Sequence, residues 1–367
     1  MQRYNSTDRE AQEERFLSPD ASLSSHSKGR AIPLDADPYR SSFQRDRDRI
    51  LHSKAFRRLS HKTQVFLAPE GDHYRTRLTH TLEVSQISRT IARALGLNED
   101  LTEAISLGHD LGHTPFGHTG EDALSYCIAK RLGREVERGP ACVIGYGKER
   151  FFRHNEQSLR VVDFLEREGK GLDLCWEVRD GIVHHTGKEK AATLEGRIVA
   201  TADRIAYVNH DLDDAVRAGL LRESDVPDEV RLILGEGHSS RIGTLVQDMI
   251  ETSSSAGDIT LSADVAAAMD ELRSFLFERV YTSEAAKLES SKAFELLLRL
   301  FEHYCEHPQE IPETTLEIAR KHPLPQCTDD VLCAAVVDHV AGMTDRFARS
   351  TFEALFVPRS WHGTAVD

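Results

Sequence analysis

The sequence predicts an all-α protein, on three observations. Two long segments, residues 76–96 and 194–220, carry apolar residues at the three- to five-residue spacing of an amphipathic helix. No run of alternating apolar and polar residues indicates a series of strands. No internal repeat is present. We therefore expect one helical catalytic core with further C-terminal helices packed on it.

The first helices can be placed in chain order from their end signals. The helix in residues 76–96 should end at Gly96 and bury one apolar stripe. This stripe consists of Leu78, Leu82, Ile87, Ile91 and Leu95. A second helix should follow, with Asn98 as its N-cap and Gly112 as its stop. The helix in residues 194–220 has the strongest pattern of the chain.

The remaining segments are also helical in pattern, with one interruption. Residues 133–150 hold several glycines and a proline, which predicts an excursion between helices, such as a small hairpin. Residues 228–306 and 328–355 predict further amphipathic helices, broken around "HPQEIPETT" and "KHPLPQ".

These patterns divide the chain into three regions. Residues 1–40 form a polar N-terminal arm without apolar periodicity, expected to be a mobile tail or to lie on a partner subunit. Residues 41–225 form the catalytic core, and residues 226–367 form a C-terminal helical region packed on it.

Composition narrows the function classes. The formal charge of −14, from 46 basic and 60 acidic residues, repels nucleic acid and anionic lipid, so a substrate phosphate needs basic groups gathered in one pocket. The six cysteines form no CxxC pair, which is typical of reduced thiols. The N-terminus has no apolar signal region, and no segment is apolar enough to span a membrane. We expect a cytoplasmic protein.

The stretch "SLGHDLGHTPFGHTGED" (106–122) carries the chemistry. It holds His109 beside Asp110, with His113 and His118 four and nine positions after His109. Neutral imidazole and carboxylate are the ligands of divalent cations that act on phosphate. Adjacent residues point in different directions on a helix, so His109 and Asp110 need at least two ligands from elsewhere.

The candidates for these ligands are His80 and Asp203, each in an unusual local pattern. Arg77 lies three residues before His80, on the same helical face. Asp203, Tyr207 and Asp211 are spaced by four, which makes a polar stripe that is costly to bury without partners. Each feature alone has an ordinary explanation: a solvated helix end, a core histidine or a solvent-facing stripe. The ordered set H…HD…D is hard to obtain by accident.

Together these residues resemble the HD-domain superfamily, specifically the deoxynucleoside triphosphate triphosphohydrolases of the bacterial dGTPase type. The similarity covers roughly residues 38–355. Its most specific stretches are "FQRDRDRILHSKAFRRLSHKTQVF", "RTRLTHTLEVSQI", "GHDLGHTPFGHTGE", "FRHNEQSLRVV", "ATADRIAYVNHDLDDA" and "GMTDRFA".

The resemblance implies a role for each matched residue. The metal ligands would be His80, His109, Asp110 and Asp203. The catalytic dyad would be His118 and Glu121. The groups near the triphosphate would be Arg77, His113, His154 and Arg204. The groups that read the deoxyribose would be Gln64, Tyr207 and Asp211.

The reaction implied is water attack on the α-phosphorus of a dNTP, which releases a deoxynucleoside and tripolyphosphate. The cofactor would be a divalent metal ion, with Mn²⁺ or Mg²⁺ expected first and Fe, Co, Ni or Zn also compatible with the ligands. Relatives behave as homo-oligomers with dNTP effectors, so the resemblance implies both for this chain. The sequence does not indicate a base preference.

Two alternatives and several residues stay open. The chain could perform another HD reaction, as a 5′-deoxynucleotidase or a phosphodiesterase, or act as a non-catalytic module that senses dNTPs or binds single-stranded nucleic acid; its acidic charge disfavours nucleic acid. His184 and His185 have no assigned role and are expected to be structural. Arg57 and Arg58 could be phosphate ligands or surface cations, and residues 342–348 are expected in a helical cap near the base.

Overall fold

The computed structural model describes residues 3–64, 75–144 and 149–358. Within these residues the prediction of an all-α fold is confirmed: they contain no strand, only an isolated bridge between Thr63 and Thr76. The α-helices are α1 (Ser6–Phe16), α2 (Ser42–Leu51), α3 (Lys54–Arg58), α4 (Arg77–Ala94), α5 (Glu99–Gly108), α6 (Gly117–Arg131), α7 (Ala141–Ile144), α8 (His154–Arg160), α9 (Trp176–Val183), α10 (Leu194–Arg217), α11 (Asp228–Leu234), α12 (His238–Ala256), α13 (Ala263–Leu276), α14 (Glu284–Glu306), α15 (Glu313–Lys321), α16 (Val331–Ala341) and α17 (Asp345–Phe356).

Short 3₁₀ or π turns connect these helices. They are η1 (Ser24–His26), η2 (Leu59–His61), η3 (Val161–Leu165), η4 (Arg167–Gly169), η5 (Glu223–Asp225), η6 (Phe277–Tyr281), η7 (Pro308–Glu310) and η8 (Pro325–Cys327). Within the described residues, no helix combines the length and the apolar character that a bilayer crossing requires.

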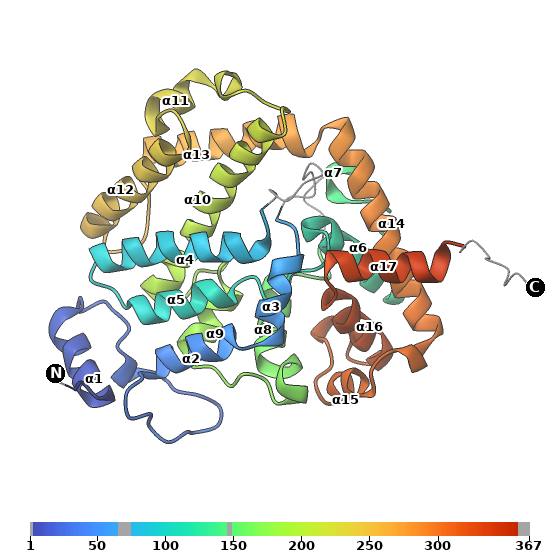
Figure 1. Ribbon diagram of the computed structural model, residues 1–367, viewed down its shortest axis with the longest axis horizontal. Helices are drawn as coiled ribbons and strands as arrows, with labels where there is room; N and C mark the ends of the chain where they lie inside the picture. The colour runs from blue at the N-terminus through green and yellow to red at the C-terminus, as the bar shows by residue number, and fades with distance from the viewer. Residues whose placement is uncertain (1–2, 65–74, 145–148, 359–367) are drawn as a thin grey trace, which may run out of the picture.

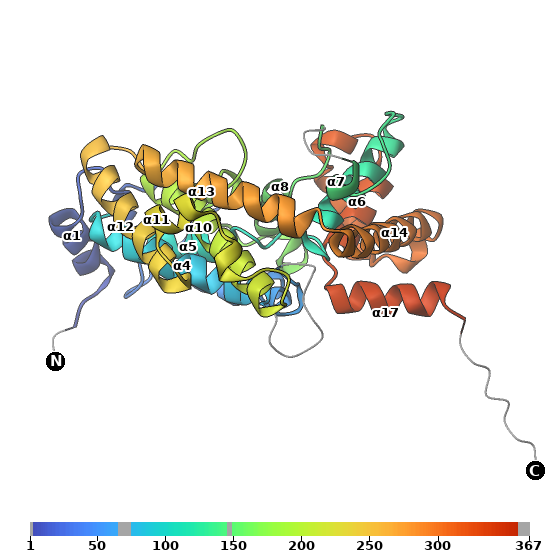
Figure 2. The ribbon, with the colours of Figure 1, turned by 90° about the horizontal axis from the view of Figure 1, so that it is seen from above.

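Two hydrophobic cores hold the helices together. The first core joins α2–α5 and α9–α13, and the second joins α6 with α14–α17. Figure 1 shows the first group on the side of α1, and the second around α17; the turned view in Figure 2 keeps the same grouping. Of the expected C-terminal region, α11–α13 pack in the first core and α14–α17 in the second, and the domain boundary at residues 225 and 226 stays a prediction.

The histidine-rich stretch crosses from one core to the other. Leu111, in the turn after α5, packs in the first core, whereas Phe116, at the start of α6, packs in the second. Phe116 has a left-handed backbone, with φ 59°, and its N–H donates to the carboxylate of Asp345 at 3.0 Å. A long-range contact therefore fixes the direction in which α6 leaves the turn.

The expectations for α4, α5 and α10 hold in most details. α4 and α10 begin and end within a few residues of their predicted limits, and Asn98 caps α5 by accepting from Leu101 N–H. Two details were wrong: Leu82 is exposed rather than part of the buried stripe, and α5 ends at Gly108, before Gly112.

The N-terminal arm is fastened to its own core, so a mobile tail was the wrong expectation for its described part. The carboxylate of Glu195, in α10, accepts from the N–H and the hydroxyl of Ser22, both at 2.9 Å. Arg30 is ion-paired with the buried Asp46 of α2. In the excursion at residues 133–150, the described part contains the short helix α7 instead of a hairpin.

Candidate active site

Two glycines shape the turn that carries His109 and Asp110. A Cβ on Gly108 would lie 2.5 Å from a methyl group of Ile182, in α9. A Cβ on Gly112 would lie 2.1 Å from the backbone nitrogen of Ser158, in α8. The Ser158 hydroxyl closes the turn by accepting from Gly112 N–H at 2.9 Å and donating to the His109 carbonyl at 2.7 Å. Close packing on α8 and α9 therefore ends α5 and turns the two side chains inward.

The four expected metal ligands meet at this turn, although they come from α4, the turn and α10. His80 Nε2 lies 2.9 Å from Asp203 Oδ1. His109 Nε2 lies 3.7 Å from Asp110 Oδ1 and 3.8 Å from Asp203 Oδ1. These separations suit ligands about 2 Å from one shared ion. The His/Asp set therefore has the spacing of a divalent cation site.

The protonation of these ligands also suits a cation. His109 donates from Nδ1 to the Ser106 carbonyl at 2.6 Å, so its other nitrogen, Nε2, keeps a lone pair; this atom is buried without a hydrogen-bond partner. Burial would raise the pKa of Asp110, but Arg77, which binds its Oδ2 at 2.6 Å, and the nearby histidines hold that pKa well below its ordinary value. Two such anionic carboxylates and an unpartnered imidazole fit a bound metal ion.

His118, Glu121 and His154 form a second cluster beside the first. Glu121 Oε2 accepts from His118 Nδ1 at 2.6 Å, and its Oε1 accepts from His154 Nδ1 at 2.8 Å. Burial would raise the pKa of Glu121, but the two histidines hold it well below its ordinary value. The His118 side chain is 68% exposed, so its Nε2 is open to a ligand. A buried carboxylate thus fixes the tautomer of an accessible imidazole.

His185 was expected to be structural, yet its ring lies between the two clusters. Its ring packs against that of His109, with centroids 5.0 Å apart, and its Nε2 lies 3.1 Å from His154 Nε2. Burial lowers the pKa of His185 to about 3, and its single proton is on Nδ1, which donates to the Ile182 carbonyl at 2.7 Å. In this arrangement His154 donates from both nitrogens and carries a positive charge. The pKa of His154 is raised in agreement with this, because the attraction of Glu121 outweighs the effect of burial.

The remaining histidine of this group, His113, stays neutral. It stacks on His154 with ring centroids 4.4 Å apart. Burial and the nearby Arg77 hold the pKa of His113 well below its ordinary value. Its Nδ1 is buried without a hydrogen-bond partner. His113 can therefore offer a ligand one uncharged donor or acceptor beside the cationic His154.

Both clusters open into one cavity of about 660 Å³. Gln64, Tyr207 and Asp211 line it, and buried oxygens of Gln64 and Asp211 have no hydrogen-bond partner among the described residues. Burial raises the pKa of Asp211 well above its ordinary value, which favours its uncharged form. Arg204 also lines the cavity, where it is exposed and makes only long contacts of 3.4 and 3.5 Å within α10.

Other residues take places that the sequence did not indicate. Arg57 is exposed and lines no described cavity, whereas Arg58 lies behind the turn, away from this site. Asp345 does not face the cavity: its carboxylate accepts from Thr63 N–H at 2.9 Å, Thr63 hydroxyl at 2.7 Å and Phe116 N–H. Asp345 therefore links Thr63 to the residue that precedes α6.

Comparison with known proteins defines the class. The HD domain matches residues 77–208, which include the four expected metal ligands and the expected dyad, and the Phosphohydrolase-associated domain matches residues 259–354. The fold and the site thus belong to the HD-domain phosphohydrolases, a metal-dependent class.

The relatives narrow this class. A deoxyguanosinetriphosphate triphosphohydrolase-like protein of Caldanaerobacter subterraneus subsp. tengcongensis is 48% identical over 349 residues, covering 95% of each chain. Proteins of the same name from Desulfatibacillum aliphaticivorans and Clostridium tetani are 46% and 43% identical, covering 94% and 93% of this chain and 95% and 93% of their own. The chain belongs to this family, as the resemblance predicted.

Proposed function

We propose that the protein hydrolyses dNTPs to a deoxynucleoside and tripolyphosphate by water attack on the α-phosphorus. The observation that carries this proposal is the meeting, in one cavity, of the His/Asp ligand set, the His118–Glu121 pair and the unpartnered oxygens of Gln64 and Asp211. The names of the relatives support the same reaction.

The charge in the cavity suits a triphosphate. His154 has a raised pKa and stacks on His113, and Arg77 lies near the ligand set. Lys188, Arg204 and Arg273 also line the cavity and have no ion-pair partner among the described residues. Phosphoryl transfer depends mainly on positioning and on stabilising phosphate charge, and a single phosphate would not need so many donors.

Three further groups of the cavity suit a deoxyribose. Tyr207 and Asp211 lie one turn apart on α10, and Gln64 lies in the segment after η2. A neutral Asp211 can both donate to and accept from a hydroxyl, and the Gln64 amide can do the same, which suits the 3′-hydroxyl. The Tyr207 ring beside them would meet a 2′-hydroxyl sterically, which favours deoxynucleotides.

The chain's own groups then account for proton transfer. A divalent metal, when bound by His80, His109, Asp110 and Asp203, supplies Lewis-acid activation of water and phosphate. The leaving 5′-oxygen is strongly basic and needs a proton. His118 presents Nε2 to the cavity while Glu121 holds its Nδ1. When Nε2 also carries a proton, His118 can deliver that proton to the leaving oxygen and return to the neutral form, which contributes about 10²–10⁴-fold.

The test is product analysis by ³¹P NMR with each of the four dNTPs and with GTP, in Mn²⁺ and separately in Mg²⁺. Asp110→Ala removes an expected ligand, and Asp213→Asn, at a half-buried position of α10 outside the cavity, serves as the matched control. Tripolyphosphate from the wild type and Asp213→Asn, and none from Asp110→Ala, is expected. Orthophosphate or pyrophosphate, or turnover of monophosphates alone, would contradict the proposal.

A further inference from the structure

A second cavity, of about 280 Å³, lies behind the turn that carries Asp110. Leu111 and Gly112 of that turn form part of its wall. The rest of the wall comes from α3 and η3 on one side and from α15, α16 and α17 on the other. The cavity therefore sits between the two halves of the molecule, and none of its lining residues lines the larger cavity.

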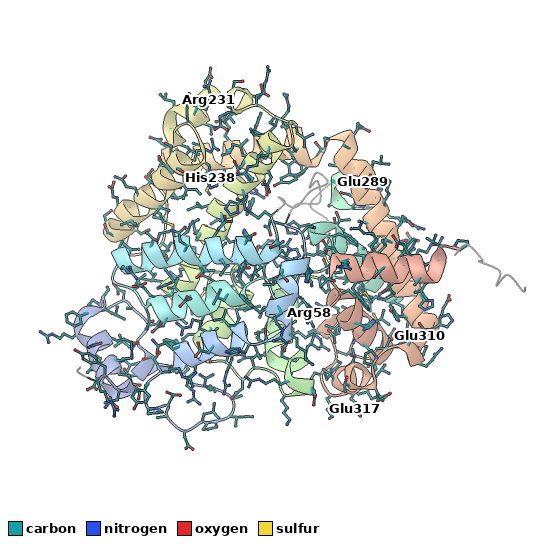
Figure 3. All side chains as sticks on the ribbon, in the orientation of Figure 1. Arg58, Arg231, His238, Glu289, Glu310 and Glu317 are labelled. Carbon is teal, nitrogen blue, oxygen red and sulfur yellow. The ribbon has the colours of Figure 1, made fainter. Side chains whose placement is uncertain are left out.

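Arg58 is the unusual residue of this second cavity. Figure 3 labels it on α3, where this helix faces the C-terminal helices. Its guanidinium has neither a hydrogen bond nor an ion pair with any described residue. Burial lowers its pKa, and only a weaker attraction from Glu166 offsets this effect. A partly buried guanidinium without a partner lacks compensation that a bound anion would supply.

The carboxylates around Arg58 are already engaged. Glu166 accepts from the backbone N–H groups of Lys54 and Ala55, at 3.1 and 2.7 Å, and so caps α3. Asp338 accepts from Arg160 through both of its oxygens, each at 2.7 Å.

The remaining charges leave the cavity basic. Lys54 and Arg167 add two exposed cations without ion-pair partners among the described residues. Among the lining residues, Glu168 is the one further carboxylate, and it is exposed. With Arg58, the lining therefore holds three uncommitted cations against one uncommitted carboxylate.

The loop at the mouth of the cavity is strained. Arg167 and Glu168 both have left-handed backbone, with φ 52° and 57°, although neither is a glycine. Only Glu166 separates them from the π turn η3. Left-handed non-glycine residues and π turns are both concentrated at functional sites, because the strain is retained only where a geometry is needed.

We propose that this second cavity is a ligand site for a phosphate group, either free or at the end of a small metabolite. The planar guanidinium of Arg58 matches the tetrahedral oxygens of phosphate through paired hydrogen bonds. Arg167 and Lys54 supply charge at the mouth, and Thr315 of α15 lies in the wall with a hydroxyl group. The site does not depend on the reaction proposed for the larger cavity.

Hydrogen exchange by mass spectrometry tests this site directly, because the larger cavity also attracts phosphate and a simple binding curve would mix the two. Amide exchange of residues 161–171 is followed in the full-length protein with inorganic phosphate or with glycerol phosphate. Arg58→Gln is compared with Arg57→Gln, its exposed neighbour. Arg167→Gln is a second variant that alters an exposed side chain, which leaves a readout if Arg58→Gln misfolds.

Phosphate should slow exchange in residues 161–171 of the wild type and of Arg57→Gln. In Arg58→Gln the concentration needed should rise roughly tenfold or more, and in Arg167→Gln by a smaller factor. Protection by inorganic phosphate identifies free phosphate as sufficient, and protection by glycerol phosphate alone identifies an esterified phosphate. No protection of this segment by either probe, or equal protection in Arg58→Gln and the wild type, would overturn the proposal.

Discussion

Glu121 and His154 are joined twice through one oxygen atom. Glu121 Oε1 accepts both from the His154 backbone N–H, at 2.7 Å, and from its ring Nδ1, at 2.8 Å. The same carboxylate holds His118 through its other oxygen. Glu121 therefore positions an accessible imidazole and a buried one in a single arrangement, and both line the larger cavity.

Glu121→Gln should lower kcat by about 10²–10⁴-fold with little change in fold. The amide keeps the shape of the carboxylate, but it lacks the negative charge that stabilises a doubly protonated His118, and its NH₂ group would face His118 Nδ1 instead of accepting from it. Steady-state kinetics with a dNTP measure the effect, with the exposed Glu156→Gln on α8 as the control. A kcat close to that of the wild type would show that this pair does not act in catalysis.

Arg77→Gln should weaken metal binding, increasingly so at lower pH. Arg77 helps to hold the pKa of Asp110 down, so without it a proton competes with the metal for this carboxylate. We expect the metal dissociation constant to rise about 10–100-fold. Metal titrations over a range of pH check this, with the exposed Arg93→Gln on α4 as the control. An affinity with the wild-type pH dependence would contradict the role given to Arg77.

Asp211→Asn should lower kcat/KM for a dNTP less than Asp211→Ala does. Because Asp211 is already uncharged, an amide of the same shape preserves a donor and an acceptor, whereas alanine removes both. We expect kcat/KM for a dNTP to fall by roughly tenfold or more in the alanine variant and much less in the asparagine variant. Asp213→Asn on the same helix controls for surface charge. Equal losses in both Asp211 variants would mean that the carboxylate acts as an anion.

Lys62→Met should alter how stability depends on pH. Lys62 donates to the carbonyls of His113 and Ala341, and burial lowers its pKa to about 7 from 10.5. Between pH 7 and 10.5 the unfolded chain binds the proton and the folded chain does not. The contribution of Lys62 to the free energy of unfolding therefore increases as pH rises and decreases as pH falls toward 7.

Above pH 7, the free energy of unfolding of the wild type should therefore increase relative to that of Lys62→Met, by up to roughly 1.4 kcal/mol per pH unit. Urea unfolding at several pH values measures this, with Lys130→Met as an exposed control. A constant difference between the two proteins across this range would rule out the assigned titration.

Much of the fold followed from local pattern, because α4 and α10 have long amphipathic stretches with recognisable ends. The end of α5 did not. The apolar spacing continues past Gly108, and the turn is closed by Ser158, which lies 46 residues after Gly112. A contact of that range leaves no signal in the local sequence.

The same limit applies to the site. The ligand set was suggested by residue type and order, and the structure brings its four members together. His185 was missed because its role depends on contacts with His109 and His154, which are distant in sequence. Its only local signal was its pairing with His184, which instead binds Asp180 at 3.0 Å.

The division of the site between the two cores affects the order in which activity and bound metal are lost on unfolding. The expected metal ligands lie on elements of the first core. His118 and Glu121 lie on α6, which packs in the second core. If the second core loosens first under denaturant, the chain keeps its ion but loses its proton donor. Turnover would then disappear at a lower urea concentration than bound metal, and the inactive species would still be a metalloprotein.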